Sequence, residues 1–114
     1  WVRDGSTYFP ANLQPLLDSI ASSDSKSGRI LANYVGKYFE DMWLHFTSVR
    51  KIMRSGAAVH YIVGNSKFYD SLVPVEQIFV DMLREAGFSD VRFTVLRKRN
   101  SKKELLEFDV VGHA

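Results

Sequence analysis

The chain has 114 residues, of which 46 % are hydrophobic and 25 % are charged, and its formal net charge is +2. This length fits one domain, and no apolar stretch approaches the roughly 20 residues that a membrane-spanning helix needs. The absence of cysteine excludes disulfides, thiolate metal sites and a cysteine nucleophile. The three histidines, His45, His60 and His113, do not have the spacing of a zinc site, so we expect no metal.

The ends and the composition also give expectations about location. The first residue is Trp1 rather than methionine, and no basic-then-apolar targeting segment follows it. We therefore expect this chain to be part of a longer protein. The lack of cysteine suits a reducing compartment and leads us to expect a cytoplasmic protein that makes no contact with membranes.

Residues 1–28 are predicted to be an irregular N-terminal segment and linker. They offer at most a short helix between Pro10 and Ile20, and the following "ASSDSKSG" has the composition of an exposed linker. Residues 29–114 are predicted to form the α/β domain.

A long amphipathic helix is predicted from about residue 29 to residue 54. Its apolar residues recur at intervals of three and four, and Gly56 lies just beyond its end. A break near Gly36 is an open alternative. Five aromatic residues lie in this helix, and their helical spacing favours core packing over a platform on which bases stack: Tyr34, Tyr38, Phe39, Trp43 and Phe46.

Residues 57–63, "AAVHYIV", are predicted to form a strand. They lack the polar alternation of a half-exposed strand, so we expect burial on both faces and parallel pairing. His60 within this run is interpreted as a hydrogen-bonded interior residue rather than a general base.

A second helix is predicted over about 74–86, because it opens on Pro74, has one apolar stripe and ends before Gly87. Strands over 91–99 and 104–111 follow, joined by a short turn as a hairpin. A strand-helix-strand crossover gives parallel strands and a hairpin gives antiparallel ones, so we expect a three-stranded mixed sheet.

This order of elements resembles the C-terminal half of a class I, Rossmann-like S-adenosylmethionine-dependent methyltransferase. "MRSGA" is similar to the turn that precedes the fifth strand of that family, and "VPVEQIFVDMLREAGF" looks like its next helix. "LRKRNSKKELLEF" resembles the basic stretch and closing hairpin of the DNA methyltransferases that modify exocyclic amines of adenine or cytosine. The resemblance covers residues 34–112 and implies the strand order 57–63, 104–111, 91–99.

The family also has features that this chain lacks. No G-x-G turn is present to bind the cofactor, and no two prolines are adjacent, so the proline-proline-aromatic motif that holds the target amine is missing. The resemblance therefore implies S-adenosylmethionine as the cofactor of a parent enzyme, with no cofactor bound by this chain alone. We expect the isolated chain to be inactive.

By the resemblance, Gly64, Asn65 and Ser66 lie where the family faces the target base, and their amide and hydroxyl groups are suited to bonding a base edge. The alternative is that these residues only terminate a strand and form a turn, as such residues often do.

The basic stretch near the C-terminus suggests phosphate contacts with DNA, through Arg97, Lys98, Arg99, Lys102 and Lys103. The alternative is a solvated hairpin whose cations discourage edge-to-edge aggregation. Alternation along a strand sends Arg97 and Arg99 to one face and Lys98 to the other, so these residues do not all reach one duplex.

Three functional hypotheses follow. In the first, the chain is a fragment of a DNA methyltransferase that supplies part of the target-base wall and a basic hairpin. In the second, it is a non-catalytic interaction or dimerisation module, because a strand at 57–63 with no neighbour on one side exposes a sheet edge. That edge is expected to meet the missing N-terminal half of the domain or a second copy. In the third, the same fold methylates RNA or a small molecule.

Overall fold

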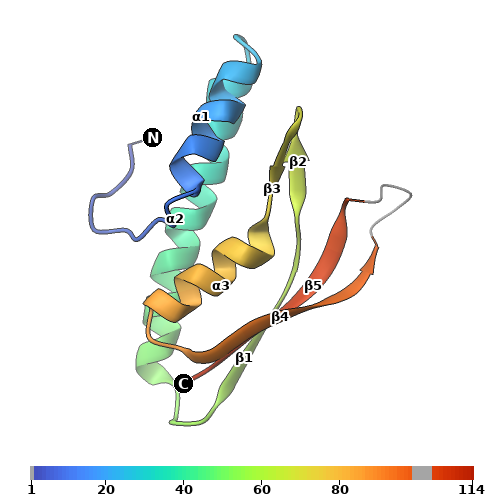
Figure 1. Ribbon diagram of the computed structural model, residues 1–114. Helices are drawn as coiled ribbons and strands as arrows, with labels where there is room; N and C mark the ends of the chain where they lie inside the picture. Colours follow the sequence, from blue (N-terminus) through green and yellow to red (C-terminus); the bar gives the residue numbers. More distant parts are fainter. Residues whose placement is uncertain (1, 99–103) are drawn as a thin grey trace.

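The computed structural model describes residues 2–98 and 104–114 (Figure 1). Over these ranges the chain forms a small α/β domain with three helices and an antiparallel sheet, accompanied by a short separate hairpin. The helices and strands follow in this order: α1 (Leu13–Ser23), α2 (Gly28–Ile52), β1 (Ala58–Gly64), β2 (Ser66–Phe68), β3 (Ser71–Val73), α3 (Val75–Glu85), β4 (Ser89–Lys98) and β5 (Leu106–His113). No helix in the described ranges has the length and apolarity needed to cross a membrane.

The first two helices form an antiparallel pair, in which α1 lies along the N-terminal half of α2 (Figure 1). Leu13, Leu17 and Ile20 of α1 are buried in the same core as α2, so the segment before residue 29 contributes to that core. The turn between the helices is tight at Gly28, where a Cβ atom would lie 2.6 Å from the carbonyl oxygen of Ala21. The long helix is continuous, without a break at Gly36.

The helix α3 is amphipathic, as its sequence predicts, and it packs against the sheet. Its end is set by Gly87, which has a φ of +103°, a conformation that glycine adopts without the steric cost of a side chain. The amide of Gly87 donates to the carbonyl oxygen of Arg84, and the amide of Phe88 donates to that of Leu83. These bonds satisfy carbonyl groups of the last helical turn.

The three main strands have the order β1-β5-β4, which confirms the order predicted from the sequence. The prediction of a mixed sheet is wrong, because β1 and β4 each pair antiparallel with β5. These outer strands run in the same direction, as a crossover through α3 requires, but β5 lies between them. Their shared direction therefore produces no parallel pair among the described strands.

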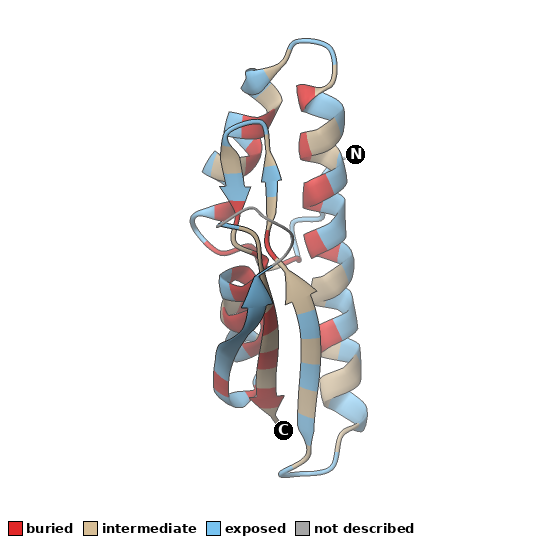
Figure 2. Ribbon diagram, turned by 90° about the vertical axis from the view of Figure 1, so that its right-hand side faces the viewer, coloured by how far each residue is buried: buried red, intermediate tan, exposed pale blue. Residues whose placement is uncertain are grey.

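The prediction that the strand at 57–63 is buried on both faces is also wrong (Figure 2). Burial alternates along β1, and Ile62 on its outer face is 58 % exposed. The opposite face contacts the helices, since the Tyr61 ring lies 5.1 Å from the Phe46 ring of α2 and 6.0 Å from the Phe79 ring of α3, between centroids. All three described helices thus lie on one face of the sheet (Figure 1 and Figure 2). On its other face, Asp109 of β5 is the neighbour of Ile62, so this solvent-facing side carries a carboxylate.

The short hairpin of β2 and β3 was not predicted, because the sequence suggested only a loop after residue 63. Its tip contains Tyr69, whose φ is +56°. The Tyr69 hydroxyl lies 2.7 Å from Ser27 Oγ, and Ser71 Oγ lies 3.0 Å from Ser19 Oγ, so the hairpin is fastened to the α1-α2 pair. Val73 at its base is buried in the core.

Candidate functional site

The residues predicted to face a substrate, Gly64, Asn65 and Ser66, lie where β1 ends and β2 begins. Gly64 and Ser66 line a pocket with a volume of about 410 Å³. Asn65 between them does not line it, because its side chain turns to the opposite side, toward β5. The structure therefore separates the three predicted residues into two that border a cavity and one that does not.

The side chain of Asn65 connects β1 to the start of β5. Asn65 is only 3 % exposed, its Nδ2 donates to the carbonyl oxygen of Glu104 at 2.7 Å, and its Oδ1 accepts from the amide of Leu106 at 2.8 Å. Both ends of the amide are thus engaged with backbone. Of the three residues predicted to contact a base edge, Gly64 and Ser66 are therefore the two whose groups face the pocket.

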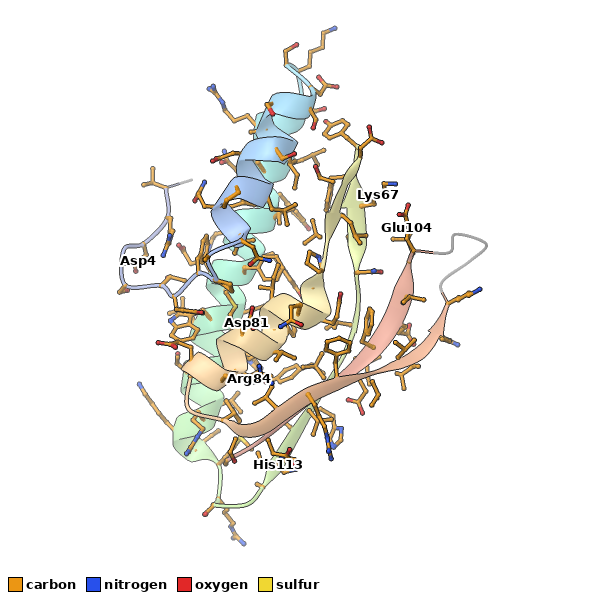
Figure 3. All side chains as sticks on the ribbon, in the orientation of Figure 1. Asp4, Lys67, Asp81, Arg84, Glu104 and His113 are labelled. Carbon is orange, nitrogen blue, oxygen red and sulfur yellow. The ribbon has the colours of Figure 1, made fainter. Side chains whose placement is uncertain are left out.

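A surface ion pair supports the same junction. Lys67 of β2 donates to Glu104 Oε1 at 2.6 Å, and Figure 3 shows the two side chains meeting between the short hairpin and the beginning of β5. Hydrogen bonding to Glu104 raises the pKa of Lys67, which keeps the ammonium charged. This pair links β2 to the segment before β5, but an ion pair this exposed contributes little to stability, so Asn65 is the main connection at the junction.

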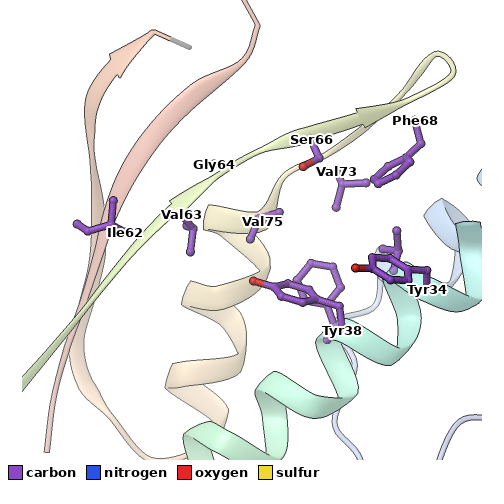
Figure 4. Close-up of a pocket in the computed structure, with 11 residues that line it drawn as sticks. Tyr34, Tyr38, Ile62, Val63, Gly64, Ser66, Phe68, Val73 and Val75 are labelled. Carbon is purple, nitrogen blue, oxygen red and sulfur yellow. The ribbon is translucent and has the colours of Figure 1, made fainter. Parts of the chain in front are cut away.

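The pocket lies between a helix and a strand (Figure 4). Tyr34 and Tyr38 of α2 form one wall, and the end of β1 forms the other. Phe68 of β2 borders the end of the pocket nearest the hairpin. Core residues that close the remaining sides are Val35, Phe39, Val73 and Val75.

The chemistry of the pocket is that of an uncharged, partly aromatic surface. The described residues that line it include no acidic or basic side chain, and their polar groups are the hydroxyls of Tyr34, Tyr38 and Ser66 with the backbone near Gly64. Burial raises the pKa of Tyr38, so its phenol stays protonated at neutral pH and can donate a hydrogen bond. Such a pocket suits an uncharged ring or side chain.

The two tyrosines were missed as site residues, because their helical spacing predicted core packing. This interpretation holds for Phe39 and Phe46, which are fully buried, whereas Tyr34 is 73 % exposed and Tyr38 is 40 % exposed. The signal that could have separated them is chemical. Phenylalanine occupies the two buried positions, and tyrosine, which tolerates water at its hydroxyl, occupies the two at the rim.

Of the predicted phosphate-binding residues, Arg97 and Lys98 lie at the exposed end of β4. Arg97 Nε is 3.2 Å from Glu107 Oε1 on the neighbouring strand, an ion pair that is open to solvent. Arg99, Lys102 and Lys103 fall outside the described residues. The structure therefore places two exposed cations at the start of the basic stretch, and one of them, Arg97, is paired with Glu107.

The interpretation of His60 as an interior residue is wrong. Its side chain is 57 % exposed on the outer face of the sheet, and its Nδ1 lies 3.1 Å from Asp109 Oδ2. An apolar run in the sequence hid this outward position. Within 2–98 and 104–114, no group of three histidine, aspartate or glutamate side chains could hold a metal ion.

We compared the chain with protein-family models, with curated proteins and with solved structures, and none of them matched.

Proposed function

We propose that this chain forms the substrate-side half of an S-adenosylmethionine-dependent methyltransferase that modifies an exocyclic amine of adenine or cytosine in DNA. The observation that carries the proposal is the strand order β1-β5-β4. In that order the last strand of the chain runs antiparallel between two strands of common direction. This is the arrangement that the resemblance implies for the end of such an enzyme.

The pocket at the end of β1 gives the proposal a location for the acceptor. Gly64 and Ser66 border the pocket at the carboxyl end of β1, where the resemblance implies that the target base lies. In this proposal the chain forms one wall of the acceptor site. Its contribution to the reaction is to orient the amine and to exclude water, and correct orientation accounts for much of the acceleration of a two-substrate reaction.

The described residues do not fit the cofactor. Nucleoside cofactors are held by a glycine-rich turn and by a carboxylate that bonds the ribose hydroxyls, and neither is found in this pocket. The proposal therefore assigns cofactor binding to polypeptide outside this chain, and the isolated chain is expected to leave DNA unmethylated.

The basic end of β4 has a separate role in the proposal. Arg97 and Lys98, with Arg99 and Lys102 beyond them, would neutralise phosphates of a bound duplex. Such contacts contribute affinity and position without reading sequence. The pocket would then receive the target base, and the cations would bind the phosphate backbone of the DNA.

The proposal is tested by expressing the whole uninterrupted reading frame that encodes this chain in a host whose DNA has no methylated amines. Nuclease digestion and mass spectrometry of the host DNA should detect N6-methyladenine or N4-methylcytosine. A Ser66→Trp variant should lose this product, because the indole would fill the pocket.

The matched control is Lys67→Trp, at the next position of the same strand. Lys67 does not line the pocket, so this variant should retain the product and lose only the surface ion pair with Glu104. The proposal is ruled out if the unaltered reading frame leaves the host DNA unmethylated and the protein that it encodes does not bind S-adenosylmethionine. Methyl groups found in RNA instead would move the substrate to RNA.

A further inference from the structure

The two edges of the three-stranded sheet differ in how they are protected. The edge strand β4 has two register irregularities in its pairing with β5, and it carries Arg92, Arg97 and Lys98. Both features discourage another strand from pairing with an edge. The other edge strand, β1, pairs with β5 in unbroken register and contains no proline and no lysine, arginine or carboxylate. Only one edge of the sheet is therefore open to strand addition.

The backbone groups at that open edge follow from the hydrogen bonds to β5. The amide of Asn65 donates to Leu106 and the carbonyl of Ala57 accepts from Ala114, so odd-numbered residues of β1 direct their groups toward β5. The amides and carbonyls that point away belong to the even-numbered residues: Ala58, His60, Ile62 and Gly64. No other described strand lies beside them.

The pocket is continuous with this edge. Ile62, Val63 and Gly64 all line it, although successive residues of a strand direct their side chains to opposite faces. The cavity therefore borders the backbone edge of β1, where the amides of Ile62 and Gly64 point outward. Its opposite wall is α2, so the edge and the helix together form a groove (Figure 4).

An exposed apolar stripe on α2 includes the two tyrosines that line the pocket. Ile30, Tyr34 and Tyr38 recur at intervals of four residues, and Ile30 is 68 % exposed. Residues at this spacing share one side of a helix. In Figure 2, α2 runs alongside β1 for most of its length. A strand added to the edge of β1 would be covered by this side of the helix, in the way that Phe46 covers Tyr61.

From these observations we propose that the edge of β1 binds an extended strand of polypeptide from outside this chain. The strand bonds through its main chain to Ala58, His60, Ile62 and Gly64, and it inserts one large uncharged side chain into the pocket between Tyr34 and Tyr38. Main-chain bonds give such complexes affinity, and side-chain pockets give them specificity. The uncharged lining disfavours an acidic or basic side chain at that position. This inference does not depend on methyl transfer, and it gives the pocket a different occupant from the proposed function, a side chain in place of a base.

The test uses NMR of the ¹⁵N-labelled protein with pools of peptides as long as β1, seven residues. The peptides alternate threonine with apolar residues, and the central residue of each pool is Phe, Leu, Asp or Lys. The Phe and Leu pools should shift the amide signals of Ala58, His60, Ile62 and Gly64 and slow their hydrogen exchange. The Asp and Lys pools should bind about tenfold more weakly, because the pocket would desolvate their charge.

Two variants separate edge pairing from general loss of structure. Ile62→Pro removes one outward amide and none of the bonds to β5, and it should weaken binding about tenfold, whereas Ile62→Val should not. Tyr34→Glu, at an exposed position, should weaken the binding of the Phe pool by a similar factor. If no pool shifts the β1 amides, the inference is wrong. It is equally wrong if those amides are already protected without peptide and sedimentation gives the mass of a dimer, because the occupant is then a second copy.

Discussion

The amide of Leu106 donates a hydrogen bond of 2.8 Å to the side chain of Asn65, across 41 residues of sequence. This bond, with the bond from Asn65 to Glu104, ties the end of one edge strand to the beginning of the central strand. Asn65 also stands between the two residues that border the pocket. Its contacts thus place a wall of the candidate site and join the strands of the sheet.

Replacing Asn65 by alanine should destabilise the protein by about 2 kcal/mol, because it removes two hydrogen bonds between a buried side chain and the part-buried backbone of Glu104 and Leu106. Urea unfolding followed by circular dichroism measures this change. Ser66→Ala, at the neighbouring half-buried position, is the control and should change the unfolding free energy by less than about 0.5 kcal/mol. Equal effects of the two substitutions would show that Asn65 has no special role in the junction.

Glu76 at the start of α3 should make stability depend on pH. It is buried, its Oε2 has no hydrogen-bond partner in the described part of the chain, and burial raises the pKa of its carboxyl above the ordinary 4.5. The folded state therefore prefers the protonated acid. The stability that Glu76 contributes is fully present below the unfolded pKa and is lost as pH rises through the higher folded pKa.

The variant Glu76→Gln tests this dependence, since it keeps the shape of the side chain and removes the charge. It should be more stable than the unaltered protein by about 1 kcal/mol at pH 7, and the difference should vanish near pH 4. Thermal unfolding at several pH values measures both quantities. The same substitution at Glu85, which is exposed, should have little effect at any pH. A difference between Glu76→Gln and the unaltered protein that grows toward low pH would contradict the expectation.

Substituting Glu107 should strengthen DNA binding if Arg97 contacts phosphate. The pair with Glu107 competes with phosphate for the guanidinium, so Glu107→Gln would free Arg97. Arg97→Gln and Lys98→Gln should each weaken binding and lower the slope of log K against log salt by about 1. Fluorescence anisotropy with a labelled duplex at several salt concentrations gives these values.

The control for that experiment is Lys26→Gln, in the turn between α1 and α2. Figure 1 shows this turn far from the end of β4. It should leave both affinity and slope unchanged. A uniform loss of affinity from all three lysine and arginine substitutions would indicate attraction to net charge alone. In that case the cations of β4 serve to protect the edge of the sheet.

A methyl group added at Gly28 should destabilise the helix pair. The new Cβ would lie 2.6 Å and 2.7 Å from two backbone oxygens of α1, which cannot move aside as a flexible side chain could. Gly28→Ala should therefore cost about 1–3 kcal/mol, the usual range for overpacking. Gly5→Ala, where no atom lies within 4 Å of the added carbon, should be nearly neutral in the same urea titration. A neutral Gly28→Ala would mean that the two helices can separate at no cost.

The helices α2 and α3 and the strand order were predictable because they depend on local pattern and connectivity. The spacing of apolar residues defined α2 and α3, and Gly87 marked the end of α3. Few residues separate β4 from β5 in the sequence, and a helix lies between β1 and β4. Those constraints, with the resemblance, were sufficient to predict that β5 lies between the other two strands.

The features that the sequence did not predict depend on contacts between distant segments. The hairpin of β2 and β3 has three residues in each strand and no glycine at its turn, and it is fixed by Ser19 and Ser27 of other elements. Ile62 and His60 are exposed because no described helix or strand covers the outer face of the sheet. The pocket needs α2 beside the end of β1, a placement that no local pattern encodes.

The central position of β5 also sets the order in which the protein can assemble during synthesis. On the ribosome both outer strands emerge before the strand that joins them, so the nascent polypeptide carries two unsatisfied partners until residues 106–113 appear. Helices form early from neighbouring residues, whereas long-range pairing of this kind is slow. Until translation reaches the last strand, therefore, the aromatic side of α2 is without its sheet and is a natural target for chaperones.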